Sequence, residues 1–166
     1  MCLRLVAVLR APGGADLQSR MQKLTFSVDV DAPVSHVWSV MLDRETYEEW
    51  AAAFYEGSTY DGGWNEGDTI RFLGPEDDET TGGLVAVVEA NRPNEFVSLR
   101  YTAEFDHGVE KTDSPIVGMK ESYSFSDTAA GTTVDVVLEL PEEWAPMMSE
   151  MWPPALAQLK RVAERP

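Results

Sequence analysis

Residues 143–165, EWAPMMSEMWPPALAQLKRVAER, decide how the chain folds, because no other long segment has a sustained helical period. Apolar side chains recur there at spacings of three and four, at Met148, Trp152, Ala155, Leu156, Leu159 and Val162. On a helix they form one wide apolar stripe, which needs a partner surface. Pro153 and Pro154 lack a backbone N–H, so we expect either a kink or a break at which Pro153 starts a new helix.

Alternating patterns upstream predict that partner surface. Between Lys23 and Val30, apolar and polar side chains alternate as in a half-buried strand. Similar patterns or flanking turn residues predict further strands over residues 58–60, 69–73, 84–90, 95–105, 120–127 and 132–140. Residues 106–118 lack a period and predict a long loop. An antiparallel sheet with one apolar face is the natural partner for the terminal helix.

Two short helices are predicted directly after the first strand. Asp31 is a candidate N-cap for a helix that runs to about Leu42, with Pro33 in its first turn. Asp43 is a candidate cap for a second helix that continues through Phe54. The two helices follow each other with almost no linker.

Composition limits the classes of partner. The 166 residues have the length of one domain, and 29 acidic against 13 basic residues give a net charge of -16. Such a charge repels nucleic acid and anionic membrane surfaces, so we expect neither as a partner. The acidity fits a cytoplasm of high salt or an acidic protein of an ordinary cell. The single cysteine, Cys2, cannot form an internal disulfide, which predicts a reducing, cytoplasmic location.

The first residues look separate from the domain. An apolar run ends at Leu9, but it is short for a leader, and Arg10 lies where a cleavage context should begin. Strand character starts only after Met21. We therefore interpret residues 1–21 as an extension that the fold does not need and residues 22–166 as the domain.

The set of motifs resembles a known superfamily. The motifs that carry the resemblance are Ala32-Pro33, Trp64-Xaa-Xaa-Gly67, Gly82-Gly83, Asn91-Arg-Pro-Asn-Glu-Phe, Glu121-Ser-Tyr-Ser-Phe and Trp152-Pro153. In this order they resemble the helix-grip fold of the START and Bet v 1-like superfamily, and within it the group named after the activator of Hsp90 ATPase. The resemblance covers residues 22–165. It implies an α+β fold in which a curved antiparallel sheet wraps around the long C-terminal helix and leaves a cavity.

Aromatic residues are the candidate site. Each could simply pack in the core, but together they could line an apolar pocket with a few hydroxyl groups. The candidate lining residues are Trp38, Trp50, Phe54, Trp64, Phe72, Tyr101, Tyr123, Met148 and Trp152. If Trp152 lines a cavity, its truncation to Ala should cost only ~1 to 2 kcal/mol instead of the ~3 to 5 kcal/mol of a close-packed site.

Catalytic and metal motifs are weak in this sequence. His36 and His107 lack companion ligands at metal-binding spacing, so we interpret both as surface histidines. The run at 76–79 lacks the spacing of a calcium loop and predicts a solvated acidic segment. Glu48 and Glu49 either face water or turn one carboxylate toward the cavity. We predict no catalytic residue, no metal and no cofactor.

Three functions remain open. The first is a non-catalytic binding protein, a monomer or homodimer, with an apolar cavity for a small hydrophobic ligand. The second, suggested by the resemblance, is a module that binds a chaperone or another protein partner. The third is a polyketide cyclase or aromatase-like enzyme, for which Tyr101, Tyr123 and Glu121 are the groups to test. Arg71 or Arg100, if turned inward, could meet an acidic ligand group; otherwise they pair with surface carboxylates.

Overall fold

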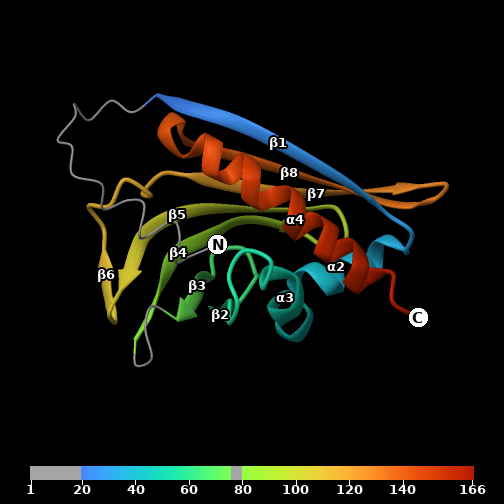
Figure 1. The fold of residues 1–166 in the computed structure, drawn as a ribbon, viewed down its shortest axis with the longest axis horizontal. Coiled ribbons are helices and arrows are strands. Elements are labelled where there is room, and N and C mark those ends of the chain that lie inside the picture. Colours follow the sequence, from blue (N-terminus) through green and yellow to red (C-terminus); the bar gives the residue numbers. More distant parts are fainter. Residues whose placement is uncertain (1–19, 76–79) are drawn as a thin grey trace.

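A computed structural model describes residues 20–75 and 80–166 and shows a curved antiparallel sheet that carries a long C-terminal helix (Figure 1). The strand order is β1-β8-β7-β5-β4-β3-β2, and β6 pairs with β5. The strands are β1 (Met21–Val30), β2 (Thr59–Gly62), β3 (Thr69–Pro75), β4 (Thr81–Arg92), β5 (Phe96–Asp106), β6 (Val109–Lys111), β7 (Lys120–Thr128) and β8 (Gly131–Pro141). The predicted helix-grip α+β fold is confirmed.

Three helices of the described part of the chain cover one face of the sheet. They are α2 (Val34–Leu42), α3 (Arg44–Ala51) and α4 (Ala145–Ala163), and a 3-10 turn (Glu142–Trp144) leads into α4. In Figure 1, α4 crosses the sheet diagonally, and α2 and α3 lie beside it. Every residue of the predicted stripe on α4 is buried. The sheet is therefore the partner surface that the stripe requires. None of the described helices is long and apolar enough to cross a membrane.

Alternation along the strands gives the sheet its apolar face. In β5, Val97, Leu99 and Tyr101 are buried, and the residues between them are only partly so. Register shifts interrupt the pairing of β4 with β5 between Val85 and Ala86 and between Val88 and Ala90. Bulges of this kind bend and twist a sheet, which helps the sheet to curve around α4.

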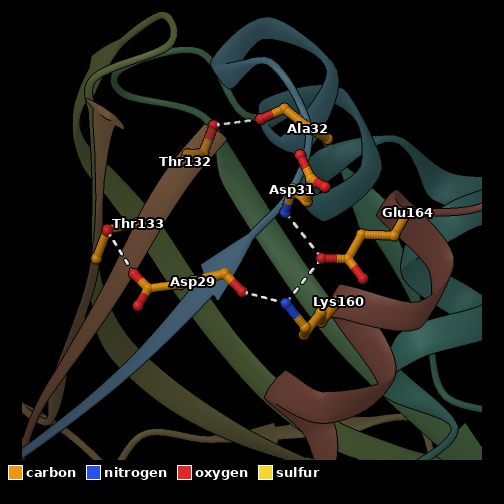
Figure 2. A network of polar contacts seen from close by, with 7 residues as sticks. All are labelled: Asp29, Asp31, Ala32, Thr132, Thr133, Lys160 and Glu164. Atoms are coloured by element: carbon orange, nitrogen blue, oxygen red, sulfur yellow. Dashed lines mark hydrogen bonds and ion pairs between the residues drawn. The ribbon is translucent and has the colours of Figure 1, made fainter. Parts of the chain in front are cut away.

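Hydrogen bonds connect the C-terminal half of α4 to the turn between β1 and α2 (Figure 2). The backbone N–H of Asp31 donates to Glu164 Oε1 over 2.8 Å, and Lys160 Nζ donates to the Asp29 carbonyl over 2.6 Å and to Glu164 over 2.7 Å. Thr132, which is fully buried, donates to the Ala32 carbonyl over 2.8 Å. Strand β8, the β1–α2 turn and the end of α4 thus form one polar cluster.

The structure corrects several local predictions. Helix α4 is continuous through Pro153 and Pro154, so of the two predicted alternatives, a kink or a break, the break is wrong. Asp31 is not the cap of α2, since Pro33 occupies the N-cap position and the Asp31 N–H bonds to Glu164 instead. Helix α3 begins after Asp43, as predicted, but ends at Ala51, and residues 52–57 form turns and a bend that carry Phe54.

Two further predictions concern loops and termini. Residues 106–118 are not wholly a loop, because Val109–Lys111 pairs with the end of β5. Strand β1 begins at Met21, the last residue of the predicted extension, and Met21 lies opposite Pro141 of β8. The predictions for residues 1–19 and for the acidic run 76–79 lie outside the described residues.

Candidate functional site

A small cavity lies where α3 and α4 face β3, β5 and β7. Its volume, about 10 Å³ of space open to the centre of a water molecule, fits roughly one water. The lining residues are Tyr47, Trp50, Phe54, Phe72, Tyr101, Glu121, Tyr123 and Trp152. Seven of these eight are aromatic, and the eighth is a carboxylic acid. The cavity has room for about one water-sized group, so a larger ligand has to displace a side chain of the wall.

Glu121 is the polar centre of this cavity. Alternation along β7 places Glu121, Tyr123 and Phe125 on its buried face, so the Glu121 side chain enters the core, and the residue is only 2% exposed. Tyr101 Oη donates to Glu121 Oε2 over 3.0 Å, and Tyr123 Oη donates to Glu121 Oε1. Two tyrosine hydroxyls thus hold one carboxyl group among aromatic rings.

The environment shifts the acidity of this pair. Burial raises the pKa of Glu121 from 4.5 to about 7, although the hydrogen bonds from Tyr123 and Tyr101 oppose the rise. Burial also raises the pKa of Tyr123, and the neighbouring Glu121 carboxylate raises it further. None of the described residues that line the cavity is Lys, Arg or His. Glu121 therefore changes its charge near neutral pH, while the raised pKa of Tyr123 keeps that hydroxyl protonated.

Trp152 closes the cavity from the side of α4. The residue is fully buried, and its ring lies 5.0 Å from that of Phe54, 6.1 Å from that of Phe26 and 6.2 Å from that of Tyr123, between centroids. Its indole N–H has no acceptor among the described residues. The indole N–H of Trp64 also lacks one, but Trp64 does not line the cavity. A buried donor without an acceptor costs ~1 to 3 kcal/mol, so the wall of the cavity retains an unused polar group.

Six of the nine candidate residues meet at this cavity: Trp50, Phe54, Phe72, Tyr101, Tyr123 and Trp152. The other three lie elsewhere. Trp38 packs edge-on against Phe125 at 4.9 Å, Trp64 packs against Tyr60 and Phe72, and Met148 is buried in the core away from the cavity wall.

The sequence-based list of lining residues lacked Tyr47 and Glu121. Tyr47 lies three residues before Trp50, so helical spacing places both on one side of α3. Glu121 was named only as a group for the cyclase alternative. Its spacing of two from Tyr123 on a predicted strand is the signal that places both side chains on the same face.

The remaining candidate groups lie outside the cavity. His36 and His107 are exposed, as predicted. Glu48 and Glu49 are exposed as well, and Glu48 accepts from Thr59 while Glu49 pairs with Arg165.

The two strand arginines face the surface. Arg71 pairs with Glu110 at 2.6 Å and Arg100 with Glu89 at 2.8 Å, so neither meets a ligand in the cavity. Among residues 20–75 and 80–166, no group of three His, Cys, Asp or Glu side chains could hold a metal ion.

The fold and the buried pocket define a helix-grip protein of the START and Bet v 1-like superfamily, as predicted. A family model described as "Polyketide cyclase / dehydrase and lipid transport" matches residues 21–164. The chain belongs to this family. Among curated proteins, no sequence matches that of this chain at a significant level.

Solved structures show the same fold at low sequence identity. Protein MLL2253 from Mesorhizobium loti has a TM-score of 0.67 and 15% identity over 87% of this chain and 98% of that chain. An AHSA1-like protein from Aeromonas hydrophila has a TM-score of 0.64 and 14% identity over 86% and 92% of the two chains. CalU16 from Micromonospora echinospora has a TM-score of 0.59 and 15% identity over 87% and 76%. At these identities the likeness concerns the fold alone.

Proposed function

We propose that this protein binds a small, mainly apolar molecule between α4 and the sheet, at the cavity beside Glu121, without chemically changing it. The observation that carries the proposal is the combination of an aromatic wall with a few polar groups in it. A core built only for stability gains nothing from a buried carboxyl that ionises near neutral pH and an indole N–H that lacks an acceptor. Binding sites have this composition, with apolar walls and a few polar groups that orient the ligand.

Phe54 is the wall residue best placed to admit a ligand. It lies in the turn segment between α3 and β2, whereas the other lining residues lie on helices and strands. Its ring contacts Trp152 edge-on and Trp50 at 6.0 Å, so its displacement opens the cavity next to both indoles. Movement of one turn side chain leaves the pairing of the sheet intact.

Indole N–H signals test this proposal. In two-dimensional ¹H–¹⁵N spectra, a neutral apolar ligand such as 3-phenylpropan-1-ol should shift the indole signals of Trp50 and Trp152. The signal of Trp38, which does not line the cavity, serves as the internal control. Signals would be assigned by Trp→Phe substitutions. Equal shifts at Trp38 and Trp152, or no shift up to the solubility of the ligand, would refute binding at this site.

One observation favours a second function, a cyclase-like enzyme of the kind named in the family description. A carboxyl group whose pKa is about 7 suits general acid–base chemistry at neutral pH. In that case Glu121 removes a proton from a bound poly-β-ketone, and Tyr101 or Tyr123 donates to the developing enolate. Mass spectrometry would detect the water lost on cyclisation, and the Glu121→Gln variant should bind this substrate without cyclising it. A linear substrate that binds and is recovered unchanged from the native protein rejects this function.

A further inference from the structure

We infer that the ligand of this cavity carries a positive charge: the geometry points to a lipophilic amine whose ammonium group binds at Glu121 inside the aromatic wall. The inference rests on the proposed function and names the chemical class of the ligand. It follows from the charge of the wall, the faces of its rings and the size of the cavity.

Within residues 20–75 and 80–166, the wall contains an acid and no base. Glu121 is the one acidic lining residue of this part of the chain, and the other titratable side chains there are the tyrosines Tyr47, Tyr101 and Tyr123. Glu121 makes no ion pair with any side chain of the described residues, and two tyrosine hydroxyls donate to it. A ligand ammonium group supplies an opposite charge that no side chain of the described residues offers to this buried carboxylate. An anionic ligand would meet the carboxylate without a described lining side chain to neutralise either charge.

The aromatic rings favour the same ligand. Cations bind over the electron-rich faces of Trp, Tyr and Phe, and the attraction is strongest where water is excluded. The three elements α3, α4 and β7 each contribute rings to the wall, including Trp50, Trp152 and Tyr123. All three residues are at least 97% buried. A cation that reaches Glu121 is therefore surrounded by aromatic rings and shielded from solvent.

The size of the cavity fits the head of such a ligand. A volume of about 10 Å³ takes one non-hydrogen atom with its hydrogens, which is the size of an ammonium group. The apolar tail then takes the space that Phe54 vacates when it moves. The net charge of -16 further attracts cations to the protein surface and repels fatty acids and other anions.

A matched series of three probes tests the inference: 3-phenylpropylamine, 3-phenylpropan-1-ol and 3-phenylpropanoate, titrated by calorimetry. The three share one apolar body and differ in charge. We expect the amine to bind at least about tenfold more tightly than the alcohol at pH 8, and the carboxylate to bind most weakly. Between pH 5.5 and 8.5 the amine affinity should rise about 30-fold, because the ionised fraction of a group with a pKa of about 7 rises by that factor. The affinity of the alcohol should not show this rise.

Two variants distinguish binding at Glu121 from attraction by the charge of the protein surface. Glu121→Gln keeps the shape of the side chain and an oxygen that accepts from a tyrosine, whereas Glu139→Gln removes the same charge at an exposed position of β8. The first should reduce amine binding to the level of the alcohol, and the second should leave both affinities unchanged. Circular dichroism checks that both variants fold.

The outcomes distinguish the two proposals. If the alcohol binds wild-type protein as tightly as the amine, or if amine binding does not change with pH, the ligand is not selected by charge and the inference is overturned, although the proposed binding function stands. If none of the three probes binds, the binding function fails as well. Equal loss of amine affinity in Glu121→Gln and Glu139→Gln would assign the attraction to the surface charge and would also overturn the inference.

Discussion

Replacement of Glu121 by Gln should change how the free energy of unfolding depends on pH. The folded state raises the pKa of Glu121 from 4.5 to about 7, so it binds the proton more tightly than the unfolded chain does. The stabilising contribution of this group is therefore fully present below pH 4.5 and is lost as the pH rises through 7. Each pKa unit corresponds to about 1.4 kcal/mol, so the total loss is about 3 kcal/mol, of which about 2.5 kcal/mol falls between pH 5 and 8.5. The Gln variant has no such proton to lose.

Urea denaturation from pH 5 to 8.5, followed by far-ultraviolet circular dichroism, measures this difference. The free energy of unfolding of the Gln variant minus that of the wild type should increase by about 2.5 kcal/mol across this range. The difference between the two proteins isolates Glu121 from the many surface carboxylates. Glu139→Gln, at an exposed position, should run parallel to the wild type. Parallel curves for wild type and Glu121→Gln would show that Glu121 is not buried as a titrating group, and the description of the cavity would be wrong.

Three other predictions concern stability. Trp152→Ala should cost ~3 to 5 kcal/mol by urea denaturation, because the cavity beside the ring is only about the size of one water and the ring is fully buried against four others; a loss below ~2 kcal/mol would indicate a larger space beside Trp152. Thr132→Val should cost ~1 to 2 kcal/mol, since it leaves the buried Ala32 carbonyl without its donor; unchanged stability would contradict this bond. Molar KCl should raise the melting temperature by screening the net charge of -16, and a flat response to salt would exclude charge repulsion as a stability factor.

Much of the fold could be predicted because its signals are local and repeated. The stripe from Met148 to Val162 requires a helix with one buried face, and strands such as β5 alternate residue by residue. The errors occur where a contact between residues far apart in the sequence determines the local structure. Asp31 has the chemistry of a helix cap, but Glu164, 133 residues away in the chain, takes its N–H. The helix through Pro153 and Pro154 persists because burial of the stripe on both sides of the prolines outweighs the missing backbone donors.

The site could be predicted only in part, for a different physical reason. Aromatic residues at strand and helix spacing identify the core, but only the packing shows which of them leave a space. In the sequence, Trp38 and Trp64 cannot be told apart from Trp50. In the structure, the ring of Trp38 packs against Phe125 and the ring of Trp64 packs against Phe72. Glu121 resembles the 28 other acidic residues of the chain until the sheet turns its side chain inward.

A crystal structure of the protein grown with 3-phenylpropylamine at pH 8 tests the central claim most directly. We predict electron density for the ligand beside Glu121, with its nitrogen within about 3 Å of a carboxylate oxygen and the ring of Phe54 displaced from Trp152. Density for a single water in an unchanged cavity, with Phe54 still packed at 5.0 Å from Trp152, would contradict the claim that this core opens to bind a small molecule.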